Sequence, residues 1–211
     1  MIKTTAIDTR PRYEALHTDG MGSDELRGRA VGVIVGAVMG LTWVGVARDG
    51  LSSVAASLVL VAGVAVCAML IVGALRLRRA AAAGGLAAPT PPGAGREKVQ
   101  RRFWLVTLGE GAAIAATVSV LGRSGRSEWI PAAICAVVGL HFIPLARLFD
   151  VPLYYATAAG LCLVAAITMI LGATGAAALW RPLPGLGAAL TLWATSLGLL
   201  LTTHTGPPVR R

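Results

Sequence analysis

Long apolar stretches alternate with short polar connections over most of the chain. Each stretch is close to the roughly 20 residues that a helix needs to span the hydrocarbon core of a bilayer. Charged and turn-forming residues separate the stretches. The pattern predicts an all-α bundle of six transmembrane helices, at 30–47, 51–75, 103–122, 129–149, 151–177 and 184–203.

The connection at 76–102 differs from the others. Its sequence, RLRRAAAAGGLAAPTPPGAGREKVQRR, is rich in Ala, Gly and Pro, with basic residues at both ends. This composition is typical of a flexible linker. We therefore expect helices 1–2 at 30–75, a flexible basic cytoplasmic loop at 76–102 and helices 3–6 at 103–203, with cytoplasmic tails at 1–29 and 204–211. A short helix starting at Ser23 is compatible with the first tail.

Composition supports an integral membrane protein. The 211 residues are 55% hydrophobic and only 14% charged, and the mean hydropathy is +0.71. A net charge of +9 would suggest nucleic-acid binding in a soluble protein, but the basic residues lie in loops and tails. They form no aromatic and basic recognition face. The expected partners are the lipid bilayer and anionic headgroups at the basic loop, with no nucleic acid.

The distribution of positive charge predicts the orientation. With six helices, one side of the membrane holds both termini and all but four of the 19 Lys and Arg residues. The positive-inside rule places that side in the cytoplasm. The Ala-, Gly-, Val- and Arg-rich composition suits a high-GC bacterial genome, and the expected location is the bacterial cytoplasmic (inner) membrane. The four residues expected on the opposite side are Arg48, Arg123, Arg126 and Arg181.

Glu110 is the most unusual residue in the apolar stretches. It lies about 10 Å along the third helix from Phe103, at a rise of about 1.5 Å per residue. A carboxylate at that depth is costly and should face the bundle interior or a water-filled cavity. Thr107, Glu110, Ala113 and Thr117 share one small, polar helix face, which we expect to point inward.

His141 lies about 12 Å along the fourth helix from Phe149, by the same rise. Because the third and fourth helices are antiparallel neighbours, His141 and Glu110 are expected at similar depth. Side-chain contact would lower the cost of both groups, but equal depth does not fix their rotation. Pro144 removes a helical hydrogen bond next to His141, which permits a kink. The pair has two interpretations, a proton or substrate pathway and interhelical hydrogen bonding.

The cytoplasmic ends of the fourth and fifth helices also carry polar side chains. Arg147 is expected to extend to the headgroups or to pair with Asp150. Tyr154 and Tyr155 are compatible with interface anchors, or with a cytoplasmic vestibule shared with His141.

Gly32, Gly36 and Gly40 recur at intervals of four in the first helix. This spacing places them on one face that another helix can approach closely. Two interpretations remain open: packing within the bundle and a homodimer seam.

The sequence contains little that resembles a catalytic or metal centre. Cys67, Cys135 and Cys162 are widely separated in apolar stretches and are expected to be packing residues. Serine-hydrolase, zinc-peptidase and nucleotide-binding motifs do not occur. We therefore predict no catalytic residues, no metal and no cofactor.

The stretch VGLHFIPLARLFDVPLYYATAAGL, at 138–161, resembles a segment of small uncharacterised bacterial membrane proteins. In these proteins a GLHF-PLA sequence ends one span and a Tyr-containing span follows. No activity is attached to them, so the resemblance implies a membrane fold and no function. The matching positions are His141, Phe142, Pro144, Leu145, Ala146, Tyr154 and Tyr155.

Three functional hypotheses follow. The first is a small transporter or proton-linked permeation protein that uses Glu110 and His141, with Thr107, Thr117, Tyr154 and Tyr155 along the pathway. The second is a non-catalytic membrane scaffold that packs through its glycine face. The third is a membrane-embedded enzyme acting on lipid, for which acid–base residues exist but no nucleophile stands out.

Overall fold

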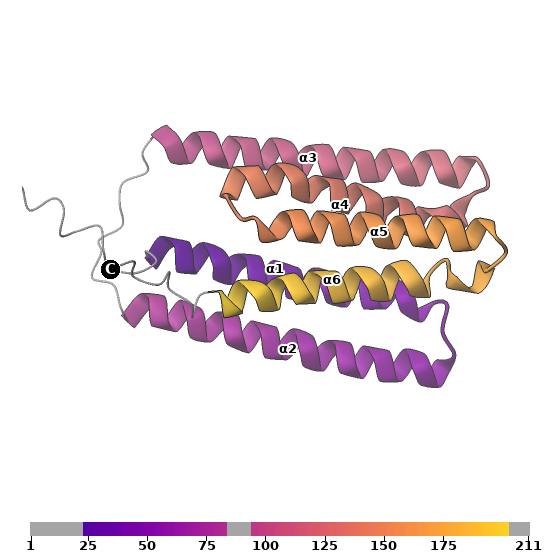
Figure 1. The fold of residues 1–211 in the computed structure, drawn as a ribbon, viewed down its shortest axis with the longest axis horizontal. Helices are drawn as coiled ribbons and strands as arrows, with labels where there is room; N and C mark the ends of the chain where they lie inside the picture. The colour runs from indigo at the N-terminus through magenta and orange to yellow at the C-terminus, as the bar shows by residue number, and fades with distance from the viewer. Residues whose placement is uncertain (1–22, 84–93, 203–211) are drawn as a thin grey trace, which may run out of the picture.

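The computed structural model describes residues 23–83 and 94–202, and every regular element in these ranges is helical. Six helices are long and apolar enough to cross a membrane, in agreement with the predicted number. They lie side by side along one axis (Figure 1). They are α1 (Ser23–Arg48), α2 (Ser53–Ala83), α3 (Ala94–Arg123), α4 (Ile130–Phe149), α5 (Leu153–Ala173) and α6 (Pro182–Leu201), with short 3-10 segments η2 (Ser127–Trp129) and η3 (Ala177–Leu179) before α4 and α6.

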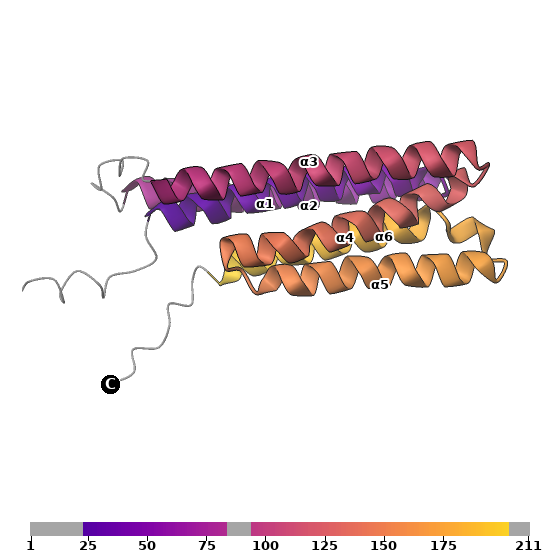
Figure 2. The same ribbon diagram turned by 90° about the horizontal axis from the view of Figure 1, so that it is seen from above.

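Helix α6 lies at the centre of the bundle and α3 at its edge. One group of helices consists of α1, α2 and α6, and a second group consists of α3, α4 and α5. Packing of α5 on α6 joins the two groups, while α3 packs mainly on α4. Figure 1 shows α3 and α2 on opposite borders of the bundle, and Figure 2, which is seen from above, shows α3 in front with α2 behind it. No described residue of the apolar part of α3 is buried, unlike in the other five helices.

The connection at 76–102 is mostly helical, so the predicted flexible loop is wrong over 76–83 and 94–102. Helix α2 continues to Ala83 and α3 already begins at Ala94. The Arg- and Ala-rich run at 76–83 has high helix propensity, and Glu97 suits the first turn of α3. Likewise, the helix starting at Ser23 is continuous with the first span. The remainder of the loop, the rest of the N-terminal tail and the C-terminal tail lie outside the described residues.

The fifth helix ends at Ala173, before the predicted residue 177, because Gly175 terminates it. Gly175 has a φ of 103°, a conformation that residues with a side chain rarely adopt. The backbone N–H of Ala176 then donates to the carbonyl of Leu171, at 3.0 Å. This is the glycine-dependent helix end expected after a C-terminal turn.

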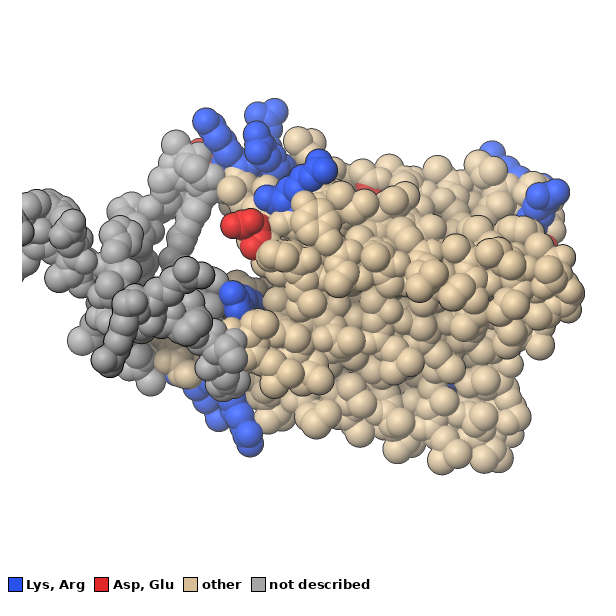
Figure 3. Space-filling view, viewed as in Figure 1, with Lys and Arg blue, Asp and Glu red and all other residues tan. Residues whose placement is uncertain are grey.

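Charged side chains are confined to the two ends of the bundle on the face drawn in Figure 3, apart from a small acidic spot. Basic residues gather mainly at one end, and a smaller set lies at the other. Apart from that spot, the wide surface between the ends is uncharged, as the lipid-facing surface of a multi-pass membrane protein would be.

Candidate functional site

Glu110 and His141 meet across the seam between α3 and α4. The Oε2 atom of Glu110 lies 3.4 Å from Nε2 of His141. Both side chains are largely shielded, at 19% and 10% exposure respectively. The structure thus shows that α3 and α4 are rotated so that the two side chains face each other, which their depth along the helices did not determine.

The antiparallel register of α3 and α4 explains this contact. Nearer the basic end, the rings of Phe103 and Phe149 lie with their centroids 6.0 Å apart. Seven residues further along α3 is Glu110, and eight residues back along α4 is His141. Nearly equal numbers of helical residues bring both polar side chains to the same level.

The predicted polar face of α3 is partly correct. Thr107, Glu110 and Thr117 are partly buried on the side that faces α4, whereas Ala113 is exposed and Ile114 takes its place. The hydroxyl of Thr117 donates to the carbonyl of Ala113, at 2.8 Å. The hydroxyl oxygen of Thr107 is buried and has no hydrogen-bond partner among the described residues.

Pro144 lies inside α4 without ending it. The predicted alternative of an Arg147–Asp150 ion pair is not realised: both side chains are exposed, and no ion pair joins them. Asp150 instead ends α4 in the left-handed conformation, with φ 53°. Its backbone N–H donates to the Ala146 carbonyl.

Of the two tyrosines, only Tyr154 packs inside the bundle, with its hydroxyl toward Gly32 of α1. Its ring packs edge-on against Phe142, with centroids 5.5 Å apart, and Phe142 is the neighbour of His141. Tyr155 is 45% exposed, as an interface anchor would be. The two tyrosines therefore do not line one wall together.

The glycine face of α1 packs inside the bundle. A Cβ atom at Gly36 would collide with Ser196 of α6, and one at Gly40 with Trp193 of α6. A Cβ at Gly32 would lie 3.2 Å from the Tyr154 hydroxyl. This face is therefore occupied within the monomer, which supports the first of the two sequence interpretations.

Helix α6 carries contacts that the sequence analysis missed. The indole N–H of Trp193 donates to the Ala37 carbonyl of α1, at 3.2 Å. The hydroxyls of Thr157 and Thr195 share a buried hydrogen bond of 2.7 Å between α5 and α6. Gly185 lies directly against Ala47. The available signal was the small and hydroxyl residues of α6 at helical spacing.

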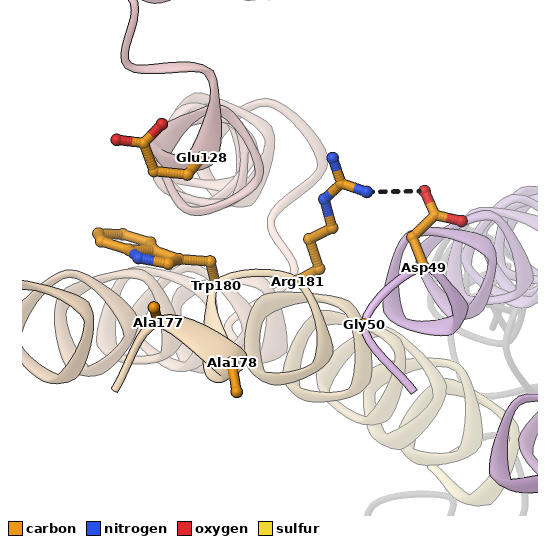
Figure 4. Close-up of a pocket in the computed structure, with 7 residues that line it drawn as sticks. All are labelled: Asp49, Gly50, Glu128, Ala177, Ala178, Trp180 and Arg181. Carbon is orange, nitrogen blue, oxygen red and sulfur yellow. Dashed lines mark hydrogen bonds and ion pairs between the residues drawn. The ribbon is translucent and has the colours of Figure 1, made fainter. Parts of the chain in front are cut away.

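A second polar region lies at the end of the bundle opposite the main basic group. Three connections meet there around a cavity of about 530 Å³ (Figure 4). Arg181 and Asp49 form an exposed ion pair with a separation of 3.4 Å, and Glu128 lies above Trp180. An exposed pair of this kind contributes at most about 1 kcal/mol. Neither Glu110 nor His141 lines this cavity.

No family model, no curated protein and no solved structure matches this chain. The resemblance at 138–161 stays a prediction. The fold and the Glu110–His141 contact are thus the basis for a functional proposal.

Proposed function

We propose that this chain is a small transporter or proton-linked permeation protein of the bacterial cytoplasmic membrane, with both termini in the cytoplasm. The observation that carries the proposal is the contact between Glu110 and His141 inside an apolar helix pair. A carboxyl group and an imidazole within reach of each other can exchange a proton. Such groups are costly in a membrane and commonly belong to ion or proton pathways.

The packing of α3 also suits a transport role. This helix carries Glu110, yet it packs mainly on α4 and has no buried residue in its apolar part. A helix with few buried contacts moves more readily than a central one. We therefore assign Glu110 as the protonatable group, His141 as its partner, and Thr107 and Pro144 to the cytoplasmic approach.

The first test is proton uptake into proteoliposomes containing the full chain. Glu110→Gln keeps the size of the side chain but cannot release a proton, so uptake should fall to the protein-free level. Glu128→Gln is the matched control, since Glu128 is an exposed carboxylate at the end of the bundle. Uptake that is equal in wild type and Glu110→Gln would contradict the proposal.

The orientation is testable with reporter fusions in bacterial cells. An alkaline phosphatase fused after Arg211 should be inactive, because this enzyme needs the oxidising periplasm for its disulfides. The same enzyme inserted after Asp49 should be active, because the positive-inside rule puts this turn outside. The reverse result would overturn the proposed topology.

A non-catalytic scaffold role is the second candidate. It is supported by the open side of α3, where Cβ atoms at Gly109 and Gly111 would meet nothing within 4 Å. The α1 glycines no longer support it, because they pack on α6 and Tyr154. Unchanged uptake in Glu110→Gln, together with loss of a co-purifying partner in Gly109→Leu, would favour the scaffold.

A further inference from the structure

Thr107 behaves differently from every other threonine inside the described helices. Each of the others donates its hydroxyl to the carbonyl four residues earlier, as helical threonines commonly do. Thr107 makes no such bond to the Phe103 carbonyl, although its oxygen is fully buried. The threonines with the usual bond are Thr42, Thr117, Thr157, Thr168, Thr191 and Thr195.

The register of α3 and α4 locates Thr107 within the seam. The Phe103–Phe149 ring contact lies on one side of it along α3, and the Glu110–His141 contact lies on the other. Thr107 is therefore at the level of Pro144, between an aromatic pair and an acid–imidazole pair. The aromatic pair separates it from the basic end of the bundle.

Pro144 provides an unsatisfied acceptor at the same level. It has no N–H, so the Leu140 carbonyl lacks its helical donor. In a helix this carbonyl points along the axis toward residue 144, which is level with Thr107, while the Leu140 side chain lies on the exposed face, at 57%. A buried hydroxyl and a free carbonyl on neighbouring helices are both costly in an apolar medium unless they are hydrogen-bonded.

We propose that Thr107, the Leu140 carbonyl and the Glu110–His141 pair bind an internal water molecule in the α3–α4 seam. Thr107 and the carbonyl offer a donor and an acceptor, and Glu110 adds a second acceptor. Buried waters typically make about three such bonds. Thr107 is thus a positioning residue, which acts through the water that it holds.

The water site adds a step to the proposed transport function, and its role in proton transfer rests on that proposed function. A proton from cytoplasmic water would pass the Phe103–Phe149 pair, protonate the bound water and move on to the Glu110 carboxylate. The water would then return to its neutral form. The other charged side chains near this end of α3 and α4 are exposed, and they include Glu97, Lys98, Arg101, Arg102, Arg147 and Asp150.

Infrared difference spectroscopy of the reconstituted full chain tests for the water directly. Spectra are recorded across a change of pH in ordinary water and in water enriched in oxygen-18. A bound water gives an O–H stretching band that shifts with the oxygen isotope. We expect the band in wild type, in Thr107→Ser and in Thr117→Val, and its loss in Thr107→Val. Thr117→Val is the matched control, because its hydroxyl bonds its own helix.

The midpoint of thermal unfolding gives a second, independent measurement. If Thr107 holds a water, Thr107→Val lowers the midpoint, because the Leu140 carbonyl and the pair lose a partner. If the hydroxyl were simply unsatisfied, the same change would raise the midpoint by removing a buried polar group. A raised midpoint, or an isotope-sensitive band that persists in Thr107→Val, would overturn the hydration site.

The two proposals fail in different ways. If the band is lost in Thr107→Val but uptake is normal in Glu110→Gln, the water site is supported and the transport function is rejected. If uptake is lost in Glu110→Gln but the band persists in Thr107→Val, the transport function is supported and the water site is rejected.

Discussion

Gly185→Ala is expected to lower the free energy of unfolding by about 2 kcal/mol, although it adds a single methyl group. A Cβ atom at Gly185 would lie 2.6 Å from the backbone nitrogen of Ala47 and 2.8 Å from its Cα. Backbone atoms cannot rotate away as a flexible side chain can. Helices α1 and α6 would therefore have to separate along one of the most extensive helix contacts in the bundle.

Gly45→Ala is the matched control for this prediction. Gly45 lies in α1, and a Cβ atom there would meet nothing within 4 Å. Because Ala favours a helix over Gly by up to about 1 kcal/mol, this variant should be as stable as wild type or more stable. Unfolding in mixed detergent micelles, followed by circular dichroism, measures both variants. Equal stability of Gly185→Ala and wild type would show that α1 and α6 are less closely packed than described.

Removing one member of the Glu110–His141 pair is expected to cost more than removing both. His141→Leu leaves a shielded carboxyl group without its partner, and Glu110→Leu leaves an imidazole alone. Each should lower the free energy of unfolding by about 2 kcal/mol, in the range between membrane hydrogen bonds and broken buried ion pairs. The double variant Glu110→Leu with His141→Leu should recover most of that loss, because apolar side chains suit this helix seam.

A double-mutant cycle at constant pH measures this coupling. Additive single losses would mean that the 3.4 Å contact contributes nothing to stability. The same double variant also separates structure from function. If the pair serves transport, the stable double variant should show no proton uptake. If the pair is interhelical hydrogen bonding alone, uptake should be unaffected by any of the three variants.

The candidate site was only partly predictable, and the reasons are physical. Sequence spacing gave the depth of Glu110 and His141, because the rise of a helix per residue is constant. Their contact depends on the rotation of α3 and α4 about their own axes, which spacing does not fix. The free hydroxyl of Thr107 depends on a side-chain rotamer, so Thr107 and Thr117 look equivalent in sequence although only Thr117 bonds its own helix.

By itself the sequence determined that this is a bundle of six apolar helices with charge at the ends. Hydropathy, helix length and charge placement are local properties, and each of them determines separately for each segment whether and in which direction it spans a bilayer. Only the tertiary structure decided that the face of α1 with Gly32, Gly36 and Gly40 packs mainly against α6. The same holds for the position of α3 at the edge of the bundle and for the contact of Gly185 with Ala47. Helix association in lipid depends on close shape fit between surfaces, because lipid tails are as apolar as the side chains and no pattern of apolar positions selects the partner.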